Sequence, residues 1–236
     1  MLQKTRDTIL LGLEELGLSN LPARPYDCPF ELLAAPKTRK KLIIVGFNGS
    51  LADMASTNSL SVIDGYENPS FFNVKAGMDG AWGVTHLAKR LYALPAELGF
   101  DPNDTIYTNA LLMCSKNAWA VKKTAEASTL GSLSALIERS MLFFSKITVA
   151  MAQPELIIAY SNGKTSHSAA RILLNSFGNG DTPDYVSVDP YYSTYGFTAT
   201  FGDSKIPVVG IRHLSRFKSD NELIKLAWQR QLAKQN

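Results

Sequence analysis

Four short apolar runs alternate with longer helical patterns along the chain, and this alternation constrains the fold most. The apolar runs cover residues 42–47, 105–112, 155–160 and 207–211. Runs rich in β-branched and aliphatic residues are typical of strands that are covered on both faces. Helical patterns cover residues 84–98, 125–151, 165–177 and 220–234, and Asp220 is the expected N-cap of the last. We therefore expect an α/β fold: a three-layer α/β/α sandwich around a short, mostly parallel central sheet.

The length and composition indicate one domain. The chain has 236 residues, of which 45% are hydrophobic, and this is enough for one large core. We expect a single domain over residues 1–236, in which residues 1–40 form an amphipathic helix and an extended lead-in. Residues 48–80 and 178–196 are rich in Gly, Asn, Ser and Asp or in aromatics, and we expect long loops there.

Charge and cysteine content limit the classes of function. The formal net charge of +3 permits contact with phosphates without arguing strongly for it. The two cysteines, Cys28 and Cys114, exclude a zinc site or iron–sulfur cluster held by four thiolates. Two isolated thiols are typical of a reduced intracellular protein, so we expect a cytoplasmic location. No apolar run approaches the roughly 18 residues needed to cross a bilayer, so we expect no membrane partner.

Three polar segments follow, or close, predicted strands. They are Gly46–Ser50, the pair Thr108-Asn109, and His213–Arg216. The carboxyl ends of parallel strands share one edge of the sheet, where open α/β folds bind their ligands. We therefore expect Asn48, Asn109 and His213 to converge in one crevice. Two carboxamides and an imidazole can form hydrogen bonds with a planar ligand and can stabilise an anion formed from it. Taken singly, each asparagine is more often a turn former or a helix cap.

In their order and strand context, these segments resemble the signature of the uracil-DNA glycosylase superfamily. The resemblance is nearest to the branches whose first motif contains Asn, the mismatch-specific and single-strand-selective enzymes. Gly46-Phe47-Asn48 matches the first motif, Thr108-Asn109 the middle one, and His213 and Ser215 the last. The likeness covers about residues 40–235. It implies a uracil-DNA glycosylase-like fold. It also implies an enzyme that excises a base from DNA by hydrolysis, without metal or cofactor.

The resemblance also implies roles for individual residues. His213 would donate to the departing base, and Asn48 would orient the attacking water, so these two are the expected catalytic residues. Asn109 would read the edge of a flipped base, and Gly46 and Phe47 would complete its binding site. Phe71 or Phe72 would stack on that base. Contacts to the DNA backbone are expected from Ser50, Arg212, Ser215, Arg216 and Lys218. We expect the protein to act as a monomer.

Departures from the family pattern leave alternatives. Gly49-Ser50 replaces the Pro-Gly of the first motif, Leu214 replaces a Pro of the last, and no carboxylate holds the water-activating position. One alternative is a catalytically weak or inactive member of the same fold that binds DNA or nucleotides. Another is an unrelated α/β hydrolase or transferase that acts on a free nucleoside or small molecule.

Overall fold

The structure, a computed structural model, describes residues 2–24, 40–50, 56–68, 78, 81–163, 168–187 and 194–235. The α-helices within these residues are α1 (Leu2–Glu15), α2 (Asn58–Glu67), α4 (His86–Glu97), α5 (Val121–Glu126), α6 (Leu133–Phe143), α7 (Ala150–Ala152), α8 (Ala169–Phe177) and α9 (Asn221–Ala233). Short 3₁₀ turns are η2 (Ala81–Val84), η3 (Pro102–Asp104) and η4 (Ala118–Ala120), and η5 (Phe144–Val149) is a π-helical turn. The strands are β1 (Pro22–Ala23), β2 (Leu42–Ser50), β3 (Ser56–Thr57), β4 (Thr105–Ser115), β5 (Leu156–Tyr160), β6 (Asp184–Tyr185), β7 (Tyr195–Phe201) and β8 (Ser204–Ile211).

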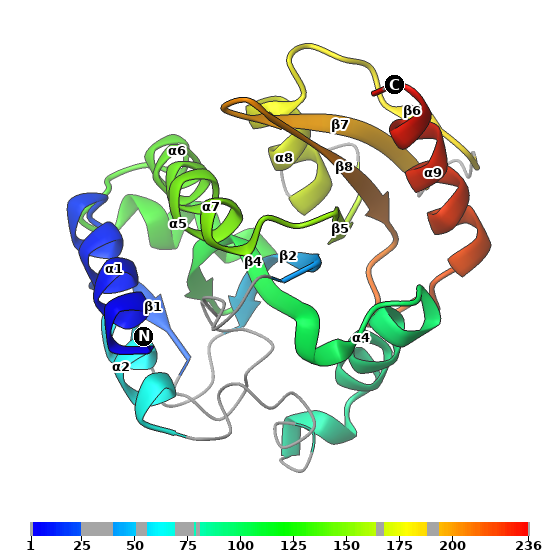
Figure 1. The fold of residues 1–236 in the computed structure, drawn as a ribbon. Helices are drawn as coiled ribbons and strands as arrows, with labels where there is room; N and C mark the ends of the chain where they lie inside the picture. Colours follow the sequence, from blue (N-terminus) through cyan, green and yellow to red (C-terminus); the bar gives the residue numbers. More distant parts are fainter. Residues whose placement is uncertain are drawn as a thin grey trace.

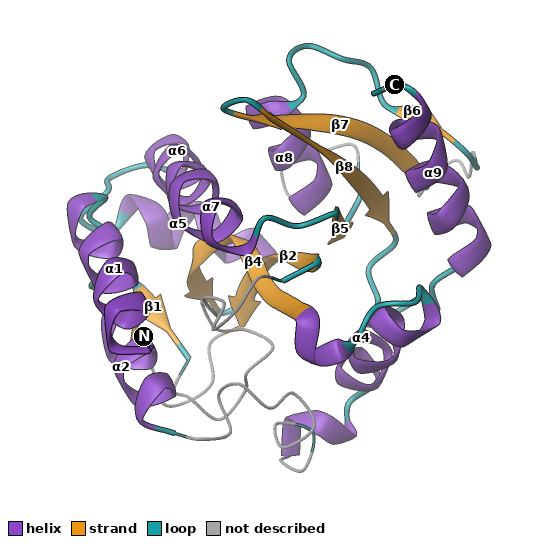
Figure 2. Cartoon of the chain, viewed as in Figure 1, coloured by secondary structure: helices purple, strands orange, loops and turns teal. Residues whose placement is uncertain are grey.

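Six of the described strands form a mixed central sheet in the order β4-β2-β5-β8-β7-β6 (Figures 1 and 2), and β1 and β3 pair as a separate antiparallel sheet. Strands β4, β2, β5 and β8 are parallel, whereas β7 and β6 are antiparallel to their neighbours. The chain passes from β2 to β4 on one side and then crosses to β5 on the other. The carboxyl ends of β2 and β5 therefore lie at the point where the strand order reverses, which is the usual ligand position in such sheets.

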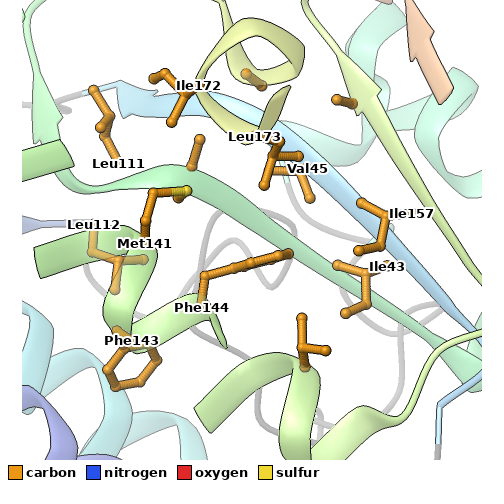
Figure 3. Close-up of a cluster of buried hydrophobic side chains, with 14 of the residues drawn as sticks. Ile43, Val45, Leu111, Leu112, Met141, Phe143, Phe144, Ile157, Ile172 and Leu173 are labelled. Carbon is orange, nitrogen blue, oxygen red and sulfur yellow. The ribbon is translucent and has the colours of Figure 1, made fainter. Parts of the chain in front are cut away.

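Helices cover both faces of this sheet because successive strand residues point to opposite faces. Ile43 and Val45 belong to a large buried cluster with side chains from α1, α5, α6 and α8. Figure 3 shows part of that cluster, with Phe144 among the side chains of the sheet and of α6 and α8. Leu42 and Ile44 belong to a second cluster, which includes side chains of α4 and α9. The expected α/β class with a helical layer on each face is therefore present, and the sheet is mixed.

Two predicted strand ends were wrong, and both errors concern the polar segments. Strand β2 continues through Asn48 to Ser50, and β4 continues six residues past Asn109, to Ser115. Asn109 lies inside its strand, directly opposite Gly46. Gly46 has no side chain, so the carboxamide of Asn109 has room beside it. The register then shifts between Asn48 and Ser50, where a step of two residues along β2 corresponds to a step of four residues along β4.

Other expected boundaries also differ. Residues 48–80, expected to form a loop, contain α2, which begins after the N-cap Thr57. The helical pattern over residues 125–151 is divided, since Gly131 has a φ of 70° and Ser132 caps a new helix, α6. Strand β7 begins at Tyr195, inside the second expected loop, and pairs with β8. The predicted N-cap of the last helix is confirmed, because Asp220 accepts a hydrogen bond from the Leu223 N–H at 3.2 Å.

Candidate functional site

A pocket of about 240 Å³ opens at the carboxyl ends of the four parallel strands. Each strand contributes to its lining: residues 47–50 of β2, Ser115 of β4, Tyr160 of β5, and His213 just after β8. Leu87 of α4 and the segment after β4, Asn117 and Ala118, form further parts of the wall. This pocket brings together two of the three side chains that were expected to converge, Asn48 and His213, but not Asn109.

The carboxamide of Asn48 is held in one orientation. Its Nδ2 donates to the carbonyl of Gly49 at 2.8 Å and to Ser115 Oγ at 2.9 Å. Ser115 in turn donates to the carbonyl of Asn117 at 2.7 Å, so three segments of the wall share one network. Both amide hydrogens are used, and Oδ1 has no hydrogen-bond partner among the described residues. An acceptor is therefore available at the pocket wall, where it can hold a water molecule.

The imidazole of His213 is fixed through one of its nitrogens. The backbone N–H of Ser215 lies 3.2 Å from Nδ1 and donates to it, and Ser215 Oγ lies 2.8 Å from the same atom. Because Nδ1 accepts, the proton of the neutral ring is on Nε2. Nε2 has no hydrogen bond to a described residue, so its N–H is available to a ligand. The ring of Tyr160 packs edge-on against the imidazole, with a centroid separation of 5.5 Å.

Two causes keep this imidazole neutral. Burial lowers the pKa of His213, and the positive charge of Arg216 lowers it further. The shift favours the uncharged form near neutral pH, because the usual value of about 6.5 is already below 7. The site therefore presents a neutral N–H donor.

Core packing and several hydrogen bonds hold the turn that carries His213, which has Leu214 as its second residue. Leu214 is buried in the second core cluster with 1% exposure. The carbonyl of Leu214 accepts a hydrogen bond of 2.6 Å from Arg90 Nη1 on α4. The carbonyl of His213 accepts from the N–H groups of Arg216 and Phe217, at 3.0 and 3.1 Å. These contacts restrict the turn without a Pro.

Asn109 lies beside this pocket and is not part of its described lining. A β-carbon on Gly46 would lie 2.5 Å from Asn109 Oδ1 and 2.4 Å from Tyr160 Oη, so the two oxygens are neighbours on either side of the glycine. Asn109 lines a separate cavity of only about 20 Å³, which it shares with Asn58 and Thr108. The phenol of Tyr160 thus occupies the space next to Gly46 and Asn109.

The other residues predicted for the site lie in different parts of the structure. Phe47 lines the pocket, but its side chain is 6% exposed and belongs to the first core cluster. Ser50 is exposed at the end of β2, and Ser215 and Arg216 are exposed beside His213. Arg212 and Lys218 line a different cavity, next to the start of α9, and Arg212 stacks over the ring of Phe217 at 5.0 Å. Phe71 and Phe72 lie outside the described residues.

The pocket also contains residues that were not predicted from the sequence: Tyr160, Ser115, Asn117 and Leu87. The side-chain alternation of the strands contains a signal for Tyr160. Ile44, Ile158 and Ile211 all face the second core cluster, and steps of two residues along each strand lead to Asn48, Tyr160 and His213. Leu87 follows no such pattern, because it comes from a helix that packs across the sheet.

Neither a metal-binding cluster nor a membrane-spanning helix is present within the described segments. No three side chains of His, Cys, Asp or Glu gather there in a way that would hold a metal ion. None of the helices in those segments combines the length and apolar character that a bilayer crossing requires. No protein-family model matches the sequence, and no curated protein matches it significantly.

Proposed function

We propose that this protein is a DNA base-excision glycosylase of the uracil-DNA glycosylase-like fold, which hydrolyses the N-glycosidic bond of uracil or a related damaged base. One observation carries the proposal. An amide acceptor from Asn48 and a neutral N–H donor from His213 are each fixed by hydrogen bonds at the wall of one pocket. That pocket lies where the strand order reverses, at the position that such sheets use for ligands.

The chemistry needs two things from the protein, and the two side chains match them. As the bond between the sugar carbon and the base nitrogen breaks, its electron pair moves onto the base and develops negative charge on a carbonyl oxygen. The Nε2–H of His213 donates to that oxygen, and such a donor is worth on the order of 3 kcal/mol in the barrier. The water oxygen then bonds to the sugar carbon. Asn48 orients this water without taking its proton, which passes to solvent or to the departed base.

An excision assay tests the proposal. Single- and double-stranded oligonucleotides that contain uracil or other damaged bases are incubated with the protein, and abasic sites are then cleaved with alkali. We expect scission by the wild type, and a loss of about 100-fold or more in His213→Ala. Asn48→Ala should also lose activity. Asn103→Ala is the matched control, because Asn103 is exposed before β4, at the opposite end of the sheet. Absence of scission by the wild type across the panel contradicts the proposal.

A second candidate is a catalytically weak or inactive member of this fold that binds DNA or nucleotides. Two observations favour it. The Tyr160 hydroxyl lies next to Gly46 and Asn109, where it competes with a base, and the described lining of the pocket contains no Asp or Glu. Salt-dependent binding of uracil-containing DNA without abasic products would support this candidate over the first. Lack of any nucleic-acid affinity would exclude both.

The proposal includes a monomer that works in the cytoplasm. The two isolated cysteines of the sequence support a reducing compartment, and Cys114 is buried as a free thiol. Light scattering on a size-exclusion column measures the mass directly. A dimer mass at micromolar concentration would contradict the monomer.

A further inference from the structure

Val84 and Trp119 are the most exposed large hydrophobic residues in the described part of the chain. Trp119 has 83% of its surface exposed and Val84 has 71%. The next values are 56% for Leu11 and 52% for Leu60. Such a large exposed fraction is unusual for Trp, whose side chain is highly buried on average.

Both residues lie close in the chain to residues that line the pocket containing Asn48 and His213. Trp119 follows Ala118, which lines the pocket, and Val84 comes three residues before Leu87, which also lines it. Their backbones are held in place. Asn117 Oδ1 accepts from the Ala120 N–H at 3.0 Å, and Thr85 Oγ1 caps α4 by accepting from the Ala88 N–H at 3.1 Å. The two exposed side chains thus come from capped turns that are each next to the pocket lining in the chain.

The charged residues nearest to Trp119 along the chain are basic. Lys116, Lys122 and Lys123 surround Trp119 in the sequence and are exposed. Residues 105–125 contain no acidic residue, and neither do residues 81–96 around Val84. Lys122 forms a long exposed ion pair of 3.8 Å with Glu126, which leaves the cluster mainly basic. A polyanion is therefore the partner that this surface matches electrostatically.

We propose that Val84, Trp119 and Lys116 with Lys122 and Lys123, together the rim patch, bind single-stranded DNA. Trp119 stacks on a base next to the nucleotide whose base enters the pocket, Val84 contacts a base on the other element of the rim, and the lysines contact phosphates. An aromatic ring beside basic residues is the usual platform for single strands, because every base has a face on which to stack. In a duplex those faces are covered by neighbouring base pairs. The inference rests on the proposed function for the identity of the pocket's ligand.

Binding of a fluorescein-labelled oligothymidylate of about 16 nucleotides, measured by anisotropy, tests the rim patch without requiring catalysis. We expect Trp119→Ala to weaken binding by about 10-fold or more, Trp119→Phe to retain most of it, and Val84→Ser to cause a smaller loss. Lys116→Gln should reduce the slope of log affinity against log salt by about 0.7. Leu11→Ser, an exposed apolar residue on α1, is the matched control and should bind as the wild type. The single strand should bind more tightly than the duplex.

The outcomes separate this inference from the proposed function. Wild-type affinity in both Trp119→Ala and Val84→Ser would overturn the rim patch, as would a wild-type protein that does not bind the single strand. Weakened binding in Trp119→Ala, in a protein that excises no base, would support the rim patch and contradict the glycosylase proposal. Base excision by a protein whose DNA binding is unchanged in Trp119→Ala would support the glycosylase proposal and contradict the rim patch.

Discussion

Replacement of Gly46 by Ala tests the closest approach in the site. The added β-carbon would lie 2.4 Å from Tyr160 Oη, 2.5 Å from Asn109 Oδ1 and 2.7 Å from Tyr160 Cζ, all shorter than real β-carbon contacts. Tyr160 and Asn109 are each only 6% exposed, so both are packed by protein on most sides, and of the two only Tyr160 lines the pocket of Asn48 and His213. Overpacking of this kind costs about 1–3 kcal/mol of unfolding free energy. In a chain of this length, each kcal/mol lowers the melting temperature by about 2–4 °C.

Thermal and urea unfolding measure this cost. Gly163→Ala is the matched control, because a β-carbon there meets nothing within 4 Å and the backbone has an ordinary φ. We expect that control to stay within about 0.5 kcal/mol of the wild type. In a Tyr160→Phe background, Gly46→Ala should cost less, because the nearest atom has been removed. The cost should not vanish, since Asn109 Oδ1 remains.

Two results would refute this reasoning. If Gly46→Ala is as stable as Gly163→Ala, the phenol and the carboxamide do not both lie against the glycine. If the cost of Gly46→Ala is the same with Tyr160 and with Phe at that position, the collision involves another group. Either result would remove the argument that Tyr160 competes with a base for this space.

Three further predictions concern the pocket and its support. Because burial and Arg216 lower the pKa of His213, the neutral ring persists as the pH falls through 6.5. Protonation would place a hydrogen on Nδ1, which accepts from the Ser215 N–H, and would disturb the turn, so excision should decline only below that pH; Arg216→Gln should move this decline to higher pH, and an unmoved pH–rate profile would argue against the Arg216 contribution. Ser115→Ala removes one hydrogen bond that orients Asn48, so single-turnover excision should slow by about 2- to 10-fold, in line with about 0.5–1.5 kcal/mol per hydrogen bond; an unchanged rate would show that the network does not position the amide. The buried Asn58 donates to the carbonyls of Leu18 and Leu112, at 2.9 and 2.7 Å. Asn58→Ala should therefore lower the free energy of unfolding in urea by about 1–3 kcal/mol; a smaller decrease would mean that other groups satisfy those carbonyls.

The sequence predicted the parallel strands well because each is a continuous apolar run. It failed where a strand contains a polar residue. Asn109 was interpreted as a strand end, but β4 accommodates it because the neighbouring strand has a glycine at the opposite position. That pairing joins residues that are far apart in the chain, so the sequence around Asn109 contains no signal of it. Helix α2 was missed for a related reason, since the Asn- and Ser-rich composition after Thr57 resembles a loop.

The candidate site was predicted in part. Asn48 and His213 were expected in one crevice because both follow apolar runs, and the pocket contains both. The protonated nitrogen of His213 depends on the fold of the turn after it, which the sequence does not determine. Tyr160 was interpreted as the last residue of a strand, and its position against Gly46 follows only from the strand order. The sequence thus identified polar groups at the strand ends and could not predict which of them face the same cavity.

The order of the strands has a consequence for how this pocket arises during synthesis. β8, which precedes His213, is made last among the parallel strands, yet it pairs with β5 inside the sheet. A nascent chain that has not yet emerged beyond residue 213 has the amide and the phenol but no imidazole. Any reactivity of the site toward a nucleic acid would therefore begin only after the rest of the sheet has left the ribosome, and a truncated translation product would be unreactive.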